Sequence, residues 1–379
     1  MAKIRIAMVG GGTGGHIYPI VSVAEKLKTW SQKSGVDMDI RYFGQPESYG
    51  QLLDIYGVRV VKIASSKLRR YFSVLNILDF FKFFIGFAQS LVKLYFYMPD
   101  VLFSKGGPGS FSVILAARCY FIPIVVHESD AIPGLANKLA SRFAKVIDLA
   151  FANARPHFQG RKAQVNLVGN PVREDVLTEM PREQAKVAFG FDPQKPLIFV
   201  IGGSQGSTRL NEFILDNLEP LLFKFQVLHQ VGKDNLNDYQ KQYNFVTKNF
   251  SPALTQNYKF VGYLEKDQSK ALDAADMVIS RGGAGAIFEI AAKGKPSILV
   301  PLPESAADHQ RQNAYEYSEK GAAIVIEESN LLPTVLIGQI EKILQNPEQI
   351  ARMSAAAKSF YQPESANQIA MHILEQWVE

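Results

Sequence analysis

Short apolar runs rich in β-branched residues alternate along the chain with stretches in which apolar residues recur at helical spacing. Such runs, bounded by glycine and polar residues, are typical of strands buried in a parallel sheet. In the first part of the chain we predict strands at Ile4–Val9, Ile40–Phe43, Val101–Phe103, Ile124–Val126 and Val146–Ile147. The alternation of strands with helices indicates βαβ units.

The same alternation restarts after the turn-rich stretch Gly169-Asn170-Pro171. There we predict strands at Leu197–Ile201, Gln226–Gln230, Lys259–Val261, Met277–Ile279 and Ser297–Val300. A chain of 379 residues is long enough for two domains, each with its own core. We therefore expect two α/β domains.

Each half opens with a strand, a glycine-rich loop and a helix. The loops are GGGTGGH (residues 10–16) and GGSQG (residues 202–206). Glycine lets backbone amides approach a ligand, and the helix N-terminus that follows favours negative charge. Two such loops facing one another at the carboxyl ends of their sheets would form an anion-binding crevice.

The first loop fits G-x-G-x-x-G at Gly10, Gly12 and Gly15, a pattern also found in dinucleotide sites. A nicotinamide or flavin site also needs an acidic residue after the second strand, but residues 41–46 offer none before Glu47. This disfavours a dehydrogenase. For His16, the pattern leaves open a structural role as a helix cap or packing residue.

Charge is unevenly distributed along a chain of otherwise ordinary composition, with 47% hydrophobic and 20% charged residues. Residues 1–170 hold 21 Lys and Arg against 10 Asp and Glu, whereas the remainder is acidic. A basic half indicates either a polyanionic partner, such as nucleic acid, acidic lipid or a phosphorylated substrate, or a solvated basic face. With Cys119 alone and no export signal, we expect a reducing compartment.

Residues 67–98 join a basic cluster to an apolar helical pattern interrupted by polar residues. The interruptions disfavour a transmembrane helix and favour one lying on a membrane surface. We expect the first part to contact lipid, and Phe87 to Tyr97 to pack on the sheet. The residues predicted at the acceptor and membrane surface are Lys67, Arg69, Arg70, Tyr71, Phe72 and Leu75.

Linked motifs in both halves resemble, in order, those of the MurG family of glycosyltransferases, glycosyltransferase family 28. They are GGGTGGHIYP (10–19), HESDAIPGLANKLASR (127–142), GNPVR (169–173), GGSQGSTRLN (202–211), HQVGKDN (229–235), RGGAGAIFE (281–289) and DHQRQNA (308–314). The resemblance spans nearly the whole chain, and several motifs in register are far more specific than one glycine loop.

The resemblance implies the GT-B fold, an α/β architecture in which two Rossmann-like domains with parallel sheets face a central cleft. Residues 1–169 would bind acceptor and membrane, residues 170–359 would bind the donor, and a helix at about 360–379 would pack back on the first domain. The implied reaction is inverting transfer of N-acetylglucosamine (GlcNAc) from UDP-GlcNAc to the 4-hydroxyl of N-acetylmuramic acid (MurNAc) in undecaprenyl-pyrophosphoryl-MurNAc-pentapeptide. This step converts lipid I to lipid II in peptidoglycan biosynthesis.

The resemblance also implies a peripheral protein on the cytoplasmic face of the cell membrane. Its partners would be UDP-GlcNAc, lipid I, the anionic membrane surface and other proteins of cell-wall synthesis and cell division, without nucleic acid or a cofactor. The implied donor-binding residues are Thr13, Gly14, Gly15, Asp130, Arg173, Ser204, Val261, Ala284, Gly285, Ala286, Ile287, Phe288, Glu289 and Gln310. Ser204 and neighbouring amides would bind diphosphate oxygens, and Glu289 would accept hydrogen bonds from ribose hydroxyls.

The implied displacement needs a base near the acceptor hydroxyl. His16 is the first catalytic candidate, because imidazole titrates near neutral pH, and Glu128 is the alternative. We expect no metal: Asp37-Met38-Asp39 precedes the strand predicted at Ile40, at the end of the sheet away from the crevice. A helix N-terminus and Arg173 would instead stabilise the UDP leaving group.

Three departures from the family pattern bear on the sugar. The common HEQN is His127-Glu128-Ser129-Asp130, the common R-S-G-A is Arg281-Gly282-Gly283-Ala284, and the threonine often found next is Ala286 or a neighbour. Asp130 places a carboxylate where the family tends to have an amide. The sequence therefore supports the nucleotide more firmly than the sugar.

The alternatives are other functions on the same fold. A lipid galactosyl- or glucosyltransferase and a UDP-GlcNAc 2-epimerase share the donor class, although an epimerase gives no reason for the basic apolar segment. A catalytically idle binding partner is disfavoured by the presence of both His16 and Glu289. Nucleic-acid binding accounts for the charge but not for the paired glycine loops.

Overall fold

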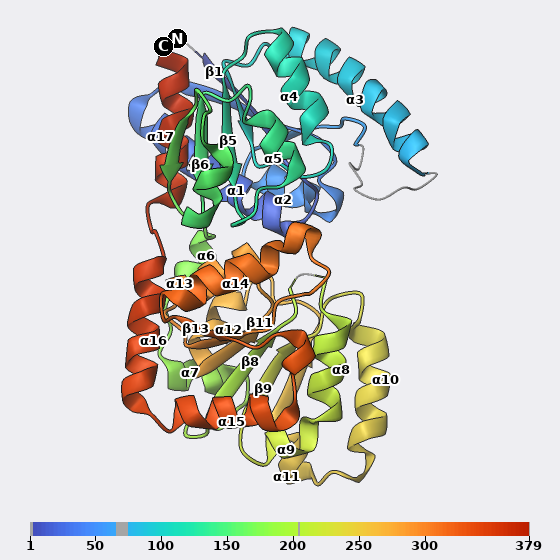
Figure 1. Cartoon of the computed structure of the whole chain (residues 1–379), viewed down its shortest axis with the longest axis vertical. Helices are drawn as coiled ribbons and strands as arrows, with labels where there is room; N and C mark the ends of the chain where they lie inside the picture. Colours follow the sequence, from blue (N-terminus) through green and yellow to red (C-terminus); the bar gives the residue numbers. More distant parts are fainter. Residues whose placement is uncertain (1–2, 66–74, 204, 379) are drawn as a thin grey trace. The chain divides into compact units, whose positions relative to one another are not determined.

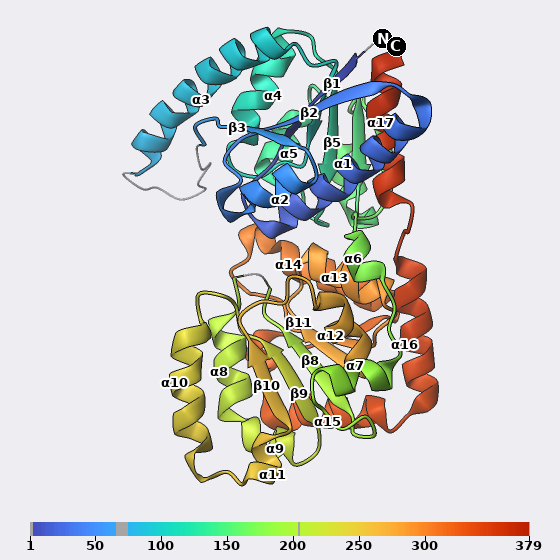
Figure 2. The same ribbon diagram turned by 180° about the vertical axis from the view of Figure 1, so that it is seen from behind.

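The computed structural model describes residues 3–65, 75–203 and 205–378 and divides the chain into two compact units (Figures 1 and 2). Unit 1 comprises Met1–Arg173 and Gln362–Glu379, and unit 2 comprises Glu174–Tyr361. Each unit contains a parallel sheet with helices on both faces. The predicted two-domain α/β fold is confirmed.

The sheet of unit 1 has seven strands within the described residues, all parallel. Their order across the sheet is β3 (Arg59–Val61), β2 (Asp37–Phe43), β1 (Lys3–Val9), β4 (Val101–Ser104), β5 (Ile124–Glu128), β6 (Val146–Leu149) and β7 (Gln164–Leu167). Strands added on both sides of β1 create a topological switch point between β1 and β4, where ligands bind in open α/β sheets.

Alternate residues of β1 enter two separate cores, one on each face of the sheet. Ile4, Ile6 and Met8 pack against α1 (Gly14–Ser34), α2 (Gly50–Ile55) and α17 (Ser365–Val378). Ala7 and Val9 pack against α3 (Leu75–Tyr97), α4 (Ser110–Cys119) and α5 (Leu135–Ala140). This period of two explains why a strand buried on both faces reads as one continuous apolar run.

Unit 2 repeats this arrangement with six described strands, all parallel. Their order is β10 (Tyr258–Val261), β9 (Gln226–Gln230), β8 (Leu197–Ile201), β11 (Met277–Ser280), β12 (Ser297–Leu299) and β13 (Ala323–Val325). The helices are α6 (Glu174–Leu177), α7 (Arg182–Ala188), α8 (Thr208–Asp216), α9 (Leu218–Leu222), α10 (Leu236–Val246), α11 (Pro252–Thr255), α12 (Gln268–Ala274), α13 (Ala284–Ala292), α14 (His309–Glu319), α15 (Pro333–Leu344) and α16 (Pro347–Phe360).

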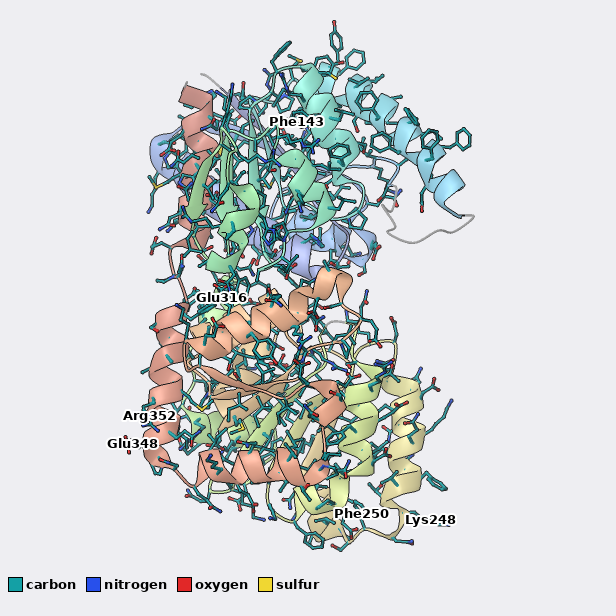
Figure 3. All side chains as sticks on the ribbon, viewed as in Figure 1. Phe143, Lys248, Phe250, Glu316, Glu348 and Arg352 are labelled. Atoms are coloured by element: carbon teal, nitrogen blue, oxygen red, sulfur yellow. The ribbon has the colours of Figure 1, made fainter. Side chains whose placement is uncertain are left out.

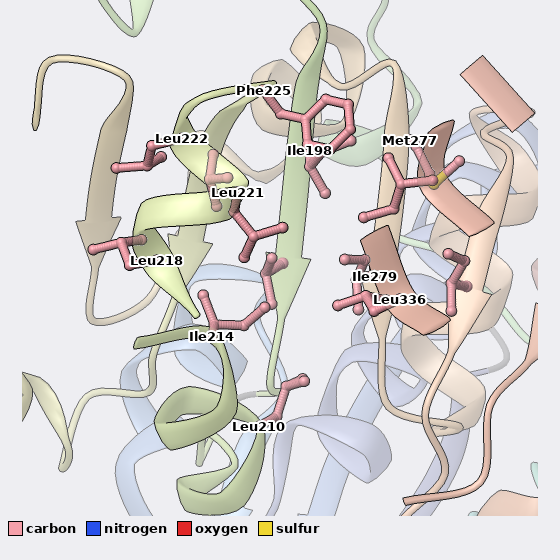
Figure 4. Close-up of a cluster of buried hydrophobic side chains, with 14 of the residues drawn as sticks. Ile198, Leu210, Ile214, Leu218, Leu221, Leu222, Phe225, Met277, Ile279 and Leu336 are labelled. Carbon is pink, nitrogen blue, oxygen red and sulfur yellow. The ribbon is translucent and has the colours of Figure 1, made fainter. Parts of the chain in front are cut away.

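One face of the unit 2 sheet carries a large aliphatic core, drawn in Figure 4. Ile198 from β8 and Met277 and Ile279 from β11 meet leucines and isoleucines from α8, α9 and α15. On the solvent face of α16, by contrast, Glu348 and Arg352 form a 3.4 Å ion pair one turn apart (Figure 3). An exposed pair of this kind adds little to stability, so the core is what holds the unit together.

The sequence prediction missed three strands, and all three lie at sheet edges. They are β3, β7 and β13. Each is short, and most of its residues are only partly buried or exposed. An edge strand covered on fewer sides needs no uninterrupted apolar run, so it gives little signal in the sequence.

Helix α3 differs from the prediction in its second half. Although Phe87, Leu91, Leu94 and Tyr97 pack on the sheet as expected, Val92, Tyr95 and Phe96 on the other side of the helix are exposed. Side chains project outward along this helix in Figure 3. Two of the polar residues that interrupt the apolar pattern attach the helix to the preceding segment: Gln89 Oε1 accepts from Ala64 N at 2.8 Å, and Lys93 Nζ donates to Lys62 O at 2.5 Å.

No helix among the described residues is both long enough and apolar enough to cross a membrane. Residues Lys67, Arg69, Arg70, Tyr71 and Phe72, predicted at the lipid surface, lie outside the described part of the chain. Leu75 is the first residue of α3.

Helix α17 returns to unit 1 and is held there by a polar contact as well as by its apolar face. His372 Nδ1 lies 2.9 Å from Oδ1 of Asp148, a fully buried carboxylate on β6. The hydrogen bond to Asp148 raises the pKa of His372 above its ordinary value. The protonated imidazole therefore stabilises the docked helix.

This pair gives a pH-dependent prediction. Because the pKa of His372 is raised on folding, its contribution to stability is complete below the unfolded-state value of about 6.5 and is lost as pH rises through the folded-state value. The difference in unfolding free energy between wild type and His372→Gln should shrink from pH 5.5 to 8.5. Trp30 and Trp377, the chain's two tryptophans, both pack in unit 1, so their fluorescence reports its unfolding. A difference independent of pH would contradict the ion pair.

Candidate active site

In unit 1, the loops after β1 and β4 lie at the switch point of the sheet. The first contains the predicted motif from Gly10, and the second is Lys105-Gly106-Gly107-Pro108-Gly109, which sequence reasoning overlooked. The hydroxyl of Tyr42 donates to Gly10 O at 2.7 Å and fixes the start of the first loop. The glycine pair Gly106-Gly107, one residue after the buried strand β4, was the signal that could have identified the second loop.

His16 lies in the first turn of α1, between these two loops. Its Nδ1 is 2.9 Å from Thr13 Oγ1, and its side chain is partly buried. A Cβ atom on Gly107, whose φ is +87°, would come within 2.8 Å of His16 Nε2. Glycine at this position therefore lets the second loop reach the imidazole edge.

Thr13, Gly14 and Gly15 form the start of α1. Thr13 is the exposed residue before the helix, with extended backbone, and its side chain bonds to His16 rather than capping the helix. Gly15 is exposed and has open space where a Cβ would lie. The first N–H groups of a helix have no acceptor within it, so this end of α1 is suited to an anionic or hydroxyl-rich ligand.

The HESD segment at the end of β5 serves as a structural brace. Burial holds the pKa of His127 well below its ordinary value, so Nε2 of the neutral ring donates to Gly169 O at 2.9 Å. Both carboxylate oxygens of Glu128 are engaged: Oε1 accepts from Asp130 N, and Oε2 accepts from Gly134 N and Asn137 Nδ2, each at 3.0 Å. These bonds fix the loop that carries Asp130, which is partly buried.

Arg173, the predicted stabiliser of the leaving group, is nearly buried at the end of unit 1. Its guanidinium carbon lies 4.3 Å from the ring centroid of Tyr18 on α1. This stacking orients the planar cation beside the helix that carries His16.

In unit 2, the loops after β8 and β11 occupy the equivalent switch point. They are joined by Arg281, whose Nε and Nη2 donate to Ser207 Oγ at 2.8 and 2.6 Å. Its Nη1 forms a 2.5 Å ion pair with Glu328. Since Glu328 also bonds to Arg209 on α8 at 2.7 Å, this network fixes the start of that helix.

The predicted donor stretch 284–289 forms the first part of α13, and its residues differ in accessibility. Ala284 is buried, and the side chains of Ile287 and Phe288 are fully buried in the interior of the unit. Gly285, Ala286 and Glu289 are partly exposed. Glu289 Oε2 accepts a hydrogen bond from Gln268 Nε2 at 3.1 Å, so a glutamine that sequence reasoning missed orients this carboxylate.

Gly282, one of the departures from the family pattern, has a structural explanation. A Cβ atom there would lie 2.2 Å from the carbonyl oxygen of Gln310. Gln310, predicted to contact the donor, is the second residue of α14, and its Oε1 accepts from Leu302 N at 3.2 Å. Glycine therefore allows the loop after β11 to lie directly against α14.

The remaining predicted donor residues are Val261 and Ser204. Val261 ends β10 and is partly buried, and its carbonyl accepts from Val231 N at 2.9 Å. Ser204 lies outside the described residues.

The acidic pair considered for a metal has other partners. Asp37 and Asp39 lie inside β2, which begins earlier than predicted because Asp37 pairs across the sheet with Lys3. The ion pairs are 3.1 Å for Lys3–Asp37 and 2.7 Å for Arg41–Asp39. Among the described residues, no group of three or more His, Cys, Asp or Glu is arranged to hold a metal.

Comparison with known proteins places this geometry in a family. The model of the glycosyltransferase family 28 N-terminal domain matches residues 6–147, and that of the C-terminal domain matches residues 197–369. A UDP-N-acetylglucosamine–N-acetylmuramyl-(pentapeptide) pyrophosphoryl-undecaprenol N-acetylglucosamine transferase of Bacillus cereus is 35% identical over 373 residues, 98% of this chain and 99% of the relative. The chain belongs to glycosyltransferase family 28.

Solved structures agree with membership of family 28. MurG of Acinetobacter baumannii superposes with a TM-score of 0.72 at 26% identity, covering 98% of this chain and 99% of that one. A UDP-GlcNAc 2-epimerase from Neisseria meningitidis, solved bound to UDP-GlcNAc, has a TM-score of 0.68 but only 13% identity, covering 98% and 100%. The epimerase shares the fold alone, whereas the resemblance to the MurG family is confirmed.

Proposed function

We propose that this chain transfers GlcNAc from UDP-GlcNAc to the MurNAc 4-hydroxyl of undecaprenyl-pyrophosphoryl-MurNAc-pentapeptide, converting lipid I to lipid II. The observation that carries this proposal is the 35% identity, along nearly the whole chain, to a relative named for that transfer. The test is whether the purified chain releases UDP from UDP-GlcNAc only when lipid I is supplied.

In this proposal, unit 2 holds the nucleotide. The diphosphate would meet N–H groups at the starts of α8 and α13, where helix N-termini favour negative charge. Arg281 would position the loop rather than bind phosphate, because its charge is already paired with Glu328. Glu289, oriented by Gln268, would accept hydrogen bonds from the ribose.

Unit 1 would supply the base. His16 is the better candidate, because its Nδ1 can donate to Thr13 Oγ1 and leave Nε2 to accept the proton of the attacking hydroxyl. Glu128 would serve as a positioning residue, because both of its oxygens already accept hydrogen bonds from its own loop and α5. As the bond to the sugar forms, the bond to UDP breaks, with Arg173 and helix N-termini stabilising the departing charge.

Membrane attachment would come from unit 1. Phe81, Ile85 and Val92 recur along one face of α3 and are 60%, 52% and 57% exposed. An amphipathic helix with such a face lies in the membrane interface, and nearby basic residues attract anionic headgroups. Arg69 and Arg70 in the preceding segment would add to that attraction.

Removing this apolar face should weaken membrane binding. The double variant Phe81→Ser/Ile85→Ser is expected to bind vesicles of phosphatidylglycerol and phosphatidylethanolamine at least about 100-fold more weakly, since burying each side chain contributes roughly 1.5–3 kcal/mol. Co-sedimentation measures the affinity. Phe245→Ser, which removes an 82% exposed side chain from α10 of unit 2, is the matched control. Equal binding by both variants would contradict attachment through α3.

A further inference from the structure

Lys105 is a buried lysine to which the proposed chemistry gives no role. It follows β4 at the switch point of unit 1 and is only 2% exposed. Its backbone N–H donates to Val9 O at 2.9 Å, beside the first glycine loop, and its Nζ donates to Ser129 Oγ. Lysine is rarely buried to this extent unless its charge is balanced.

Two carboxylates flank the residue that Lys105 contacts. Glu128, 3% exposed, precedes Ser129, and Asp130 follows it. The other titratable groups nearby are His127 on β5, which is neutral, and His16 on α1, whose imidazole meets the Lys105 loop at Gly107. The side chain facing this cluster from α5 is Asn137, an uncharged amide. Among these described groups, the balance is one lysine against two carboxylates.

The three charges depend on one another. Burial and the neighbouring Asp130 raise the pKa of Glu128 to about 7. Hydrogen bonds from Asp130 N and Asn137, together with the charge of Lys105, act in the opposite direction and lower this pKa. Burial lowers the pKa of Lys105 to about 8, while the negative charges of Glu128 and Asp130 act to raise it. The Glu128 carboxylate, buried in this site, therefore ionises more readily while the lysine cation is near.

We propose that Lys105 is a positioning residue: its ammonium group neutralises the Glu128 and Asp130 carboxylates and thereby fixes the loop that presents Asp130 to the substrate. The consequence for structure is direct, because the backbone N–H groups of Asp130 and Gly134 both bond to the Glu128 carboxylate. Protonation of that carboxylate would weaken the bonds that shape the loop. The proposal rests on the proposed function for the identity of the substrate.

A double-mutant cycle tests this role. Lys105→Met removes the charge but keeps a linear side chain, and Asp130→Asn removes one carboxylate at nearly constant shape. The variants are Lys105→Met, Asp130→Asn, the double variant, and Lys105→Arg, which keeps the charge. For each, kcat/KM for lipid I is measured from pH 5.5 to 9, together with the Kd for UDP, which separates an effect on nucleotide binding from an effect on lipid I.

We expect Lys105→Met to lower kcat/KM about ten-fold or more at pH 7.5, because it leaves the buried Glu128 carboxylate without its cation. Since the pKa of a carboxylate rises when a nearby cation is removed, the acidic limb of the pH profile should move upward by about one unit. The double variant should be several-fold more active than Lys105→Met, because removing one carboxylate restores the balance. Lys105→Arg should keep the acidic limb in its wild-type position.

A Lys105→Met enzyme with the wild-type pH profile would overturn the proposal, as would a double variant no more active than Lys105→Met. If the wild type transfers no sugar to lipid I, the proposed function fails, but the charge balance is still tested by unfolding. Urea unfolding of unit 1, followed by Trp30 and Trp377 fluorescence, should then show that Lys105→Met is less stable than the double variant and than Lys105→Arg. If Lys105→Met does not fold, recovery of folding in the double variant supports the proposal, and no recovery overturns it.

Discussion

Replacing His16 with alanine is expected to lower kcat about 100-fold or more, the usual contribution of a general base. The imidazole lies at the switch point of unit 1, where two glycine loops meet and the lack of a Cβ at Gly107 avoids a clash with Nε2. Without it, the attacking hydroxyl has no group in place to take its proton. The Kd for UDP should change much less than kcat, because most of the predicted donor-binding residues belong to unit 2.

Two further variants separate chemistry from structure at this site. Thr13→Val removes the hydroxyl that lies 2.9 Å from His16 Nδ1 and should lower kcat by a smaller factor, about ten-fold. The imidazole then loses the hydrogen bond that orients it but can still accept a proton. His157→Ala, in the same unit but outside the loops, is the control for losing an imidazole. If His16→Ala turns over at nearly the wild-type rate, His16 is structural and another residue is the base.

The second large effect is expected at Glu289. Replacing it with alanine should weaken UDP binding roughly 10- to 100-fold, because hydrogen bonds to a charged carboxylate contribute roughly 1.5–3 kcal/mol. Gln268→Ala should have a smaller effect in the same direction, since Gln268 orients Glu289 through a 3.1 Å hydrogen bond. Calorimetric titration with UDP measures both.

The matched control is Glu348→Ala on α16, where the side chain is 80% exposed and forms a 3.4 Å ion pair with the surface residue Arg352 (both labelled in Figure 3). Removing this carboxylate should leave UDP affinity unchanged. The Kd of UDP is also compared with those of thymidine diphosphate and 2′-deoxyuridine diphosphate, which lack the ribose 2′-hydroxyl. If Glu289 binds the ribose, the wild type should bind UDP more tightly than the other two nucleotides, and Glu289→Ala should lose this preference. An unchanged preference would place Glu289 away from the ribose.

The sequence predicted the central strands of both sheets because buried parallel strands need uninterrupted apolar runs. It did not predict β3, β7 and β13, since edge strands can be short and partly polar. The start of β2 was also misplaced, because Asp37 and Asp39 read as surface polar residues although cross-strand and local ion pairs hold them in the strand. The pattern of hydrophobic and polar residues does not show which distant residue will pair with an aspartate across the sheet.

At the site, the glycine loops after β1 and β8 were predicted, whereas the glycine loop after β4 and the residues that fix these loops were not. In the sequence, Lys105 stands in a glycine-rich turn, where a lysine is expected to be exposed to solvent. Only the folded structure shows that its Nζ donates a hydrogen bond to Ser129 Oγ. The motif around residues 284–289 was recognised as a unit, yet the structure separates Ile287 and Phe288, which pack in the interior, from Glu289 at the partly exposed face. A motif records which residues occur together, not which of them reach a ligand.

The account is tested most directly by one transfer assay. Purified chain is incubated with UDP-GlcNAc labelled in the sugar and with lipid I in detergent micelles, and UDP release and the labelled lipid are both quantified. We expect UDP release that depends on lipid I, equals the labelled lipid formed, and falls with His16→Ala. UDP release without lipid I, conversion of UDP-GlcNAc to its 2-epimer, or no reaction at all would contradict the central claim.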